Sequence, residues 1–162
     1  MDLSRIQLVA GLRPAEAQEI VALGSPLRLS SGAALFGLGE PAERLFIVER
    51  GRIALMAPLE LNRHQQDVLV EERVAGEVVG WSALIPPYRY TLDAVASIET
   101  DLIAIARTAL LGYVAAQSRV SCILMENVAK VVGQRLQVFQ AMWLREMQQA
   151  IELRGQAAGR LP

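Results

Sequence analysis

The stretch GAALFGLGEPAERLFIVERGRIAL (residues 32–55) combines short apolar runs with closely spaced glycines. Its runs LFIV (45–48) and IALM (53–56) are rich in aliphatic and aromatic side chains, which favour β-strands. The intervening ERGR places Gly51 where a tight turn requires a positive φ angle. The pattern predicts two strands, 45–48 and 53–56, that pair antiparallel as a hairpin.

Short apolar segments of the same kind lie on both sides of this stretch. They cover 26–30, 68–74 and 91–107, and the last of them breaks into two strands near 99–101. The polar segment NRHQQ (62–66) is expected to form a longer loop. A regular succession of short strands and turns is typical of a β-sandwich or a barrel-like jelly roll. We therefore expect a mainly β domain of the α+β class, a jelly-roll β-sandwich with short N-terminal helices.

Both ends of the chain carry helical patterns. RPAEAQEIVALG (13–24) has Pro14 near its start, Glu16 in its first turn and Gly24 at its end, which predicts a short helix. From about residue 107 onward there is no proline until the C-terminus, and apolar residues recur at helical spacing.

The predicted domain organisation has three parts. They are a jelly-roll domain over 1–117, one long helix over 118–153 and a disordered tail over 154–162. Such a helix is about 54 Å long at 1.5 Å per residue, which is more than a small sandwich can cover. Its apolar face therefore predicts a partner helix. The residues expected at the interface of a homodimer are Val132, Leu136, Phe139 and Trp143.

Composition excludes several classes of function. The chain has 162 residues with 16 Lys and Arg against 17 Asp and Glu, and the basic residues are scattered, so electrostatic binding of nucleic acid is not expected. No uninterrupted apolar run reaches the roughly 18 residues that a membrane span needs, and the N-terminus lacks the apolar core of a secretory signal. We expect a cytoplasmic protein without a membrane partner.

The sequence also lacks the residues that a catalytic site or a metal site would need. The only cysteine, Cys122, and the only histidine, His64, cannot form an internal disulfide or a conventional Cys/His zinc site. No Ser/His/Asp or Cys/His set can be assembled around a histidine placed in a polar loop. We expect no catalytic residues, no metal and no resident cofactor, and hence a protein that is not an enzyme.

The stretch GEVVGWSALIPPYRYTLDA (76–94) contains the candidate binding residues. Gly76 and Gly80 bracket Glu77, and a short helix is expected directly after Gly80. The first N–H groups of a helix have no partner within it, so those of Ser82 and Ala83 are expected to be available to a phosphate.

The order of these pieces resembles the cyclic-nucleotide-binding domain of the catabolite activator protein/Fnr superfamily. The resemblance covers about residues 10–150. Residues 32–55 resemble that family's strand, Gly-Glu-x-Ala turn and following hairpin. Residues 76–84 resemble its phosphate-binding cassette, Gly-(Asp/Glu)-x-(Ile/Phe)-Gly-Glu-(Leu/Ile)-(Ala/Gly)-Leu, which is followed by Arg-(Ser/Thr)-Ala. The resemblance implies a regulatory domain that binds a cyclic nucleotide. In the family, the Glu of the cassette binds the ribose and the Arg binds the cyclic phosphate.

This sequence departs from the cassette where the ligand is held. Trp81 occupies the position of the ribose-binding Glu. Matching Thr91 to the family's Ser/Thr puts Tyr90 at the position of the Arg, with Arg89 one residue too early and therefore on the opposite face of an extended chain.

The long helix departs as well. The resemblance implies that the base contacts two residues of this helix, and small hydroxyl side chains are usual there. Phe139 and Gln140 stand at those positions here. The candidate ligand residues are therefore Gly76, Glu77, Gly80, Trp81, Ser82, Ala83, Arg89, Tyr90 and Thr91, with Phe139 and Gln140 on the side of the base.

Two functions remain open at this stage. The first is a stand-alone regulatory or sensor module with a degenerate cassette, which acts through a small nucleotide-like ligand or an unknown protein partner and binds cyclic nucleotides weakly. The second is a ligand-free structural dimerisation or adaptor protein whose pocket is closed by Trp81. After residue 153 only RGQAAGRLP remains in this chain, so no DNA-reading helix-turn-helix is expected if the chain is the whole protein.

Overall fold

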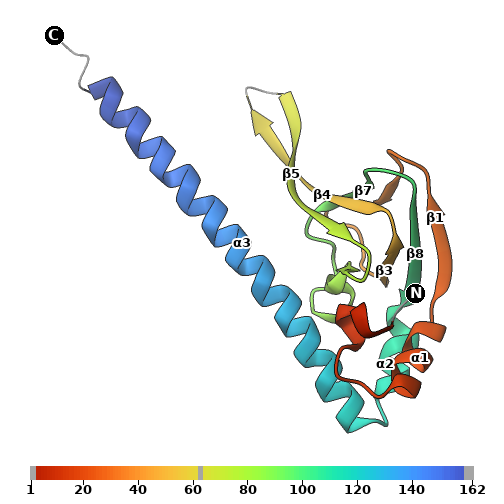
Figure 1. Ribbon diagram of the computed structural model, residues 1–162. Coiled ribbons are helices and arrows are strands. Elements are labelled where there is room, and N and C mark those ends of the chain that lie inside the picture. Colours follow the sequence, from red (N-terminus) through yellow and green to blue (C-terminus); the bar gives the residue numbers. More distant parts are fainter. Residues whose placement is uncertain (1–2, 62–63, 159–162) are drawn as a thin grey trace. The chain divides into compact units, whose positions relative to one another are not determined.

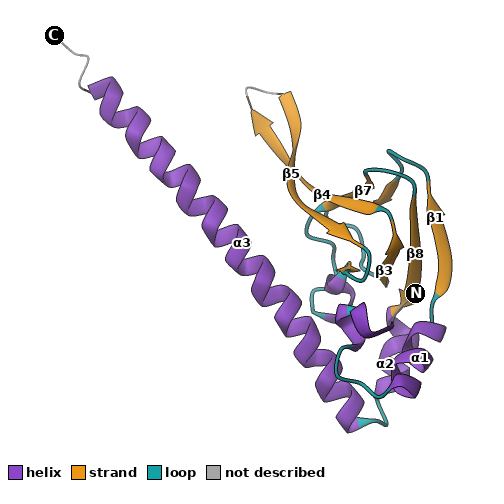
Figure 2. Cartoon of the chain, in the orientation of Figure 1, coloured by secondary structure: helices purple, strands orange, loops and turns teal. Residues whose placement is uncertain are grey.

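The computed structural model describes residues 3–61 and 64–158. The chain divides into two compact units, residues 1–128 and residues 129–162. Figure 2 distinguishes the helices from the strands, and Figure 1 labels the α-helices and those strands for which there is room. The elements that lie wholly in the first unit are η1 (Leu3–Arg5), η2 (Gln7–Val9), α1 (Pro14–Ala22), β1 (Ser25–Leu29), β2 (Ala34–Phe36), β3 (Arg44–Arg50), β4 (Arg52–Leu61), β5 (His64–Val74), β6 (Val78–Val79), η3 (Trp81–Leu84), β7 (Asp93–Ala96), β8 (Thr100–Ala106) and α2 (Arg107–Val114). The last helix, α3 (Ser118–Ala158), begins in the first unit and continues into the second.

The strands form two four-stranded antiparallel sheets. One has the order β1-β8-β3-β6 and the other β2-β7-β4-β5. Their aliphatic side chains form the core, in which Leu45, Ile47, Ile53, Leu102 and Ile105 are completely buried. The mainly β fold class and the short N-terminal helices, α1 included, are confirmed.

The predicted hairpin between residues 45–48 and 53–56 is wrong in its pairing. Gly51 does adopt a positive φ of 94°. However, β3 and β4 lie in different sheets. A Cβ atom on Gly51 would lie 2.5 Å from Thr100 Oγ1 and 2.6 Å from the carbonyl oxygen of Glu99. The turn packs against the β7–β8 turn and is a corner at which the chain passes from one sheet to the other.

The true hairpin partner of β4 is β5. Their ladder runs from Arg52 opposite Val74 to Leu61 opposite His64. The predicted loop at 62–66 is therefore wrong for residues 64–66, which belong to β5, while residues 62–63 lie outside the described part of the chain. Polar side chains are compatible with a strand here because a long ladder satisfies the backbone hydrogen bonds.

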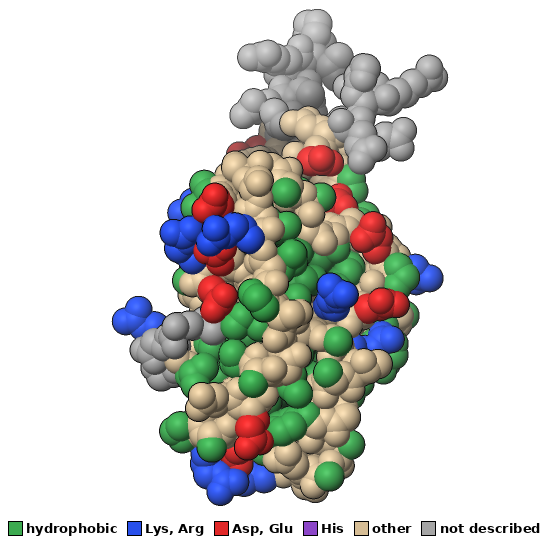
Figure 3. All heavy atoms as spheres, turned by 90° about the vertical axis from the view of Figure 1, so that its right-hand side faces the viewer, with side chains coloured by type: hydrophobic (Ala, Val, Ile, Leu, Met, Phe, Trp, Pro, Cys, Tyr) green, Lys and Arg blue, Asp and Glu red, His purple; other side chains and the backbone are tan. Residues whose placement is uncertain are grey.

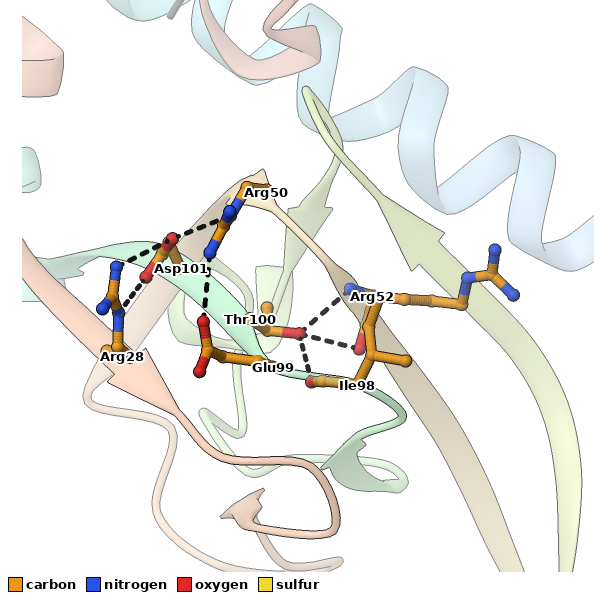
Figure 4. Close-up of polar contacts among 7 residues, drawn as sticks. All are labelled: Arg28, Arg50, Arg52, Ile98, Glu99, Thr100 and Asp101. Carbon is orange, nitrogen blue, oxygen red and sulfur yellow. Dashed lines mark hydrogen bonds and ion pairs between the residues drawn. The ribbon is translucent and has the colours of Figure 1, made fainter.

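Thr100 holds the corner together (Figure 4). Its side chain is completely buried. The backbone N–H of Arg52 donates to Thr100 Oγ1 (3.0 Å), and the hydroxyl lies within hydrogen-bond distance of the carbonyl oxygens of Ile98 (2.9 Å) and Arg52 (3.1 Å). One side chain thereby fastens the start of β4 to the start of β8.

Replacing Thr100 by valine, which has nearly the same shape, should lower the free energy of unfolding by about 1–3 kcal/mol, because it leaves the Arg52 N–H without its acceptor. Urea denaturation followed by circular dichroism measures the change. The exposed Thr91→Val is the matched control and should change stability by less than about 0.5 kcal/mol. Equal losses in the two variants would contradict the role of Thr100 at the corner.

The last helix, α3, spans both units. In the first unit, the buried Asn127 side-chain amide donates to the carbonyl oxygens of Leu8 (3.0 Å) and Ala10 (2.8 Å) and so fastens its beginning to the N-terminal segment. The helix continues to Ala158 and not only to residue 153, consistent with the high helix propensity of the alanines at 157 and 158. Residues 159–162 of the predicted tail lie outside the described part of the chain.

The second unit, described to residue 158, consists of the remainder of α3. It exposes many large apolar side chains, among them Trp143 (61%) and Ile151 (64%). Three of the four predicted interface residues, Leu136, Phe139 and Trp143, are exposed in the single chain. Among the described helices, none combines the length and the apolar character that crossing a membrane would require.

Candidate ligand-binding cassette

Two glycines frame the cassette, and both have positive φ, 90° at Gly76 and 78° at Gly80. A Cβ atom on Gly76 would lie 2.5 Å from the carbonyl oxygen of Arg5. On Gly80 it would lie 3.1 Å from the carbonyl oxygen of Arg44 and from the ring of Tyr90. Close packing within this chain therefore already accounts for both glycines.

A short helix follows Gly80, as the sequence predicts. It is the 3-10 helix η3, and the backbone N–H of Ala83 donates to the carbonyl oxygen of Gly80 (3.0 Å). The expectation that this N–H is available to a phosphate is therefore wrong, because the tight turn uses it. The side chains of Ser82 and Ala83 are buried, and that of Trp81 is half-buried.

Glu77 completes the turn between the glycines. Its Oε2 accepts a hydrogen bond from the backbone N–H of Val74 (2.8 Å), and its Oε1 lies 3.3 Å from Arg73 Nη1. These contacts hold the end of β5 against the start of the cassette.

Arg73 is a residue that the sequence analysis missed. Alternation along β5 marks the side of the valines as the inner face, yet Val74 is 44% exposed and Arg73 only 3%. Arg73 is buried because two carboxylates surround it, Glu77 and Glu71, whose Oε1 lies 2.7 Å from Nη2. A β-bulge in the β4–β5 pair, between Leu55 and Met56, shifts the alternation by one residue, and the sequence pattern of this strand carries no signal for it.

Tyr90 fills the position at which the resemblance expects an arginine. It is 6% exposed and stacks on Phe36, another residue that the sequence analysis missed, with ring centroids 3.7 Å apart and planes inclined by 10°. Its hydroxyl donates to the carbonyl oxygen of Arg44 (2.8 Å). Burial raises the pKa of Tyr90 above its usual value. The position thus holds a neutral aromatic side chain.

Arg89, by contrast, is exposed and braces a neighbouring loop. Its Nη1 donates to the carbonyl oxygen of Gly39 (2.6 Å), and its backbone forms a bridge with Pro41. Two backbone bonds, from Gly39 N–H to the carbonyl of Tyr90 (2.8 Å) and from Tyr90 N–H to the carbonyl of Glu40 (3.0 Å), join the same segments. Thr91, next in the chain, is also exposed.

A hollow of about 260 Å³ lies beside Tyr90. Its charged lining consists of two carboxylates, Glu40 and Glu43, and one guanidinium, Arg44. This balance of charge does not favour an anionic phosphate. The remaining lining residues are Leu27, Leu35, Phe36, Pro41 and Phe46.

A larger hollow of about 580 Å³ lies away from the cassette, on the β1-β8-β3 sheet. Viewed from the side of β1 and β8, the surface shows acidic and basic side chains close to one another (Figure 3). The two arginines of this hollow, Arg28 and Arg50, are paired with Asp101 (2.6 and 3.1 Å), and Arg50 also with Glu99 (3.1 Å) (Figure 4). Arg28 lowers the pKa of Asp101, and the exposed pairs brace edge strand β1 rather than form an anion site.

The contacts described above assign no role to the other predicted site residues. Phe139 and Gln140 belong to the second unit, and their contact with a base stays a prediction. His64 begins β5, but its side chain lies outside the described part, and Cys122 is an exposed free thiol. Within residues 3–61 and 64–158 no group of three or more His, Cys, Asp or Glu side chains could hold a metal ion.

Comparisons with known proteins agree with this fold. Residues 26–117 match the model of the cyclic nucleotide-binding domain family. One similar solved structure is the N-terminal domain of a transcriptional regulator from Streptomyces coelicolor A3(2), with 24% identity over 83% of this chain and 94% of that chain and a TM-score of 0.69. No curated protein matches the chain.

Two further solved structures are similar. A cyclic nucleotide-binding domain from Methylobacillus flagellatus KT has 17% identity over 88% of this chain and 79% of that chain, with a TM-score of 0.75. The catabolite activator protein of Thermus thermophilus has 22% identity over 92% of this chain and 63% of that chain, with a TM-score of 0.66. Such identities show the fold alone.

Proposed function

Because the chain belongs to the cyclic nucleotide-binding domain family, we propose that it is a regulatory or sensor module with a degenerate cassette. It acts through a small nucleotide-like ligand or a protein partner and carries out no catalysis. Its cassette keeps the backbone frame of two glycines and a short helix, but its polar side chains differ from those that hold a cyclic nucleotide.

The observation that carries this proposal is the surroundings of Tyr90 and Arg89. Tyr90 stands at the arginine position, buried against Phe36, and offers no positive charge. Arg89 donates to the carbonyl of Gly39 and braces a loop. With Trp81 in place of the ribose-binding carboxylate, both charged contacts of the usual ligand are missing from their positions.

We predict that cAMP binds weakly or not at all. Each missing charge-assisted hydrogen bond is worth about 1.5–3 kcal/mol, which lowers affinity by roughly one to two powers of ten per contact. Isothermal titration calorimetry of the full chain with cAMP measures this directly. A sub-micromolar dissociation constant would show that other residues replace both contacts and would contradict the degenerate cassette.

The half-buried Trp81 at the start of the cassette favours one alternative, a ligand-free structural dimerisation or adaptor protein whose pocket this indole closes. Titration with a panel of cyclic mono- and dinucleotides separates the two functions. Saturable binding by the unmodified protein supports the regulatory module. Binding by Trp81→Ala alone, with none by the unmodified protein or by the control Trp143→Ala, supports the closed pocket.

A further inference from the structure

Ring contacts and hydrogen bonds hold Tyr90 in one position. Its ring stacks on Phe36 with centroids 3.7 Å apart, and the ring of Phe36 lies 6.0 Å from that of Phe46. All three rings are buried. The Tyr90 hydroxyl donates to the carbonyl oxygen of Arg44 (2.8 Å), and its backbone N–H donates to that of Glu40 (3.0 Å). Both the side chain and the backbone of this residue are therefore fixed.

The same ring lies against the second glycine of the cassette. A Cβ atom on Gly80 would lie 3.1 Å from Tyr90 Cε1 and 3.5 Å from Phe46 Cδ2. With no side chain and a positive φ of 78°, the backbone of Gly80 permits another group to approach closely. The group that approaches it in this protein is an aromatic ring of its own chain.

The hollow beside Tyr90 gives this place an opening to solvent. Tyr90 and Phe36 line this hollow of about 260 Å³, and so do Glu40 and Glu43, which are exposed. Tyr90 thus contacts Gly80 and also forms part of the wall of the hollow. Removing a large side chain from a packed core leaves a space, because the surroundings relax only partly. A space left by this ring would adjoin the hollow, so a small molecule in solution has a path to it.

We propose that the ring of Tyr90, stacked on Phe36, occupies the space beside Gly80 that a planar ligand of the cassette would need. The cassette is then closed by its own chain, and the module acts through a protein partner. The closing group is Tyr90 and not the half-buried Trp81. This inference rests on the proposed function, since it takes residues 76–84 as the cassette and chooses between its two kinds of partner.

Calorimetric titration of the full chain with adenosine tests it, and this probe carries no phosphate for the acidic hollow to repel. The unmodified protein should not bind it at millimolar concentration. Tyr90→Ala uncovers the ring of Phe36, and stacking of a base on an aromatic ring corresponds to roughly ten- to hundredfold in affinity. This variant should therefore bind adenosine at least about tenfold more tightly than the unmodified protein. Phe36→Leu/Tyr90→Ala should lose the gain, and the control Trp81→Ala should show none.

Thermal unfolding gives a second readout. Tyr90→Ala should melt about 6–20 °C below the unmodified protein, because it leaves a cavity. The probe 4-methylphenol, which is the tyrosine side chain as a free molecule, should raise that melting temperature by about 2 °C or more and leave the unmodified protein unchanged. Leu45→Ala is the matched control, since Leu45 is completely buried but does not line the hollow, and 4-methylphenol should not stabilise it. Tyr90→Val, which keeps part of the volume, replaces Tyr90→Ala if that variant does not fold.

Failure of the inference differs from failure of the proposed function. Saturable binding of adenosine by the unmodified protein overturns the inference, needs no variant, and leaves a ligand-binding regulatory module. A folded Tyr90 variant that binds adenosine no better than the unmodified protein also overturns it, because Tyr90 would then be an ordinary core residue. A gain by Trp81→Ala alone assigns the closure to Trp81. None of these results decides against a regulatory module that acts through a protein partner.

Discussion

Gly51→Ala is expected to lower the free energy of unfolding by about 3 kcal/mol or more. The φ of 94° at this residue costs a side chain about 1–2 kcal/mol. The new Cβ would also lie 2.5 Å from Thr100 Oγ1, 2.6 Å from the carbonyl oxygen of Glu99 and 2.7 Å from Thr100 Cα. Two of these atoms belong to the backbone, so no change of rotamer relieves the clash. Urea and thermal denaturation measure the loss.

The control for this variant is Gly32→Ala. Gly32 also has a positive φ, 81°, but a Cβ there would meet no atom within 4 Å. It should therefore show only the conformational part of the loss, about 1–2 kcal/mol. Equal losses at the two positions would mean that the corner at Gly51 can move aside and is not fixed by its contact with the β7–β8 turn.

We propose that the protein is a parallel homodimer joined along α3, and Leu136→Glu is then expected to convert it into a monomer or an insoluble species. In the single chain Leu136 is 58% exposed, within a stretch of α3 that also exposes Phe139 (48%) and Trp143 (61%). Continuous exposed apolar surface of this kind marks an interface. A two-fold axis along the helix pair would place each introduced charge near its symmetry mate, so their repulsion and burial act together.

Light scattering at micromolar concentration measures the outcome as a change in mass relative to the single chain of 17.7 kDa. Gln134→Glu is the matched control, because it adds a charge close by on α3 at an exposed position that is already polar. It should leave the dimer intact. A mass of one chain for the unmodified protein would contradict the dimer and would leave the apolar surface of α3 to another partner.

Local features of this protein could be predicted from its sequence. Strand and helix periods follow from the spacing of apolar residues, which depends only on neighbours along the chain. The positive φ of Gly51 and the short helix after Gly80 follow from local turn chemistry in the same way. The resemblance to the family rests on such local motifs as well, and the match over residues 26–117 agrees with it.

Contacts between residues far apart in the chain decided what the sequence pattern could not. Gly51 turns the chain into the other sheet, and not into a hairpin, where it packs against Glu99 and Thr100 of the β7–β8 turn. Tyr90 is buried because Phe36 supplies a ring on which it stacks. Burial and pairing depend on which surfaces meet when the sandwich closes, and a period along one strand does not contain that information.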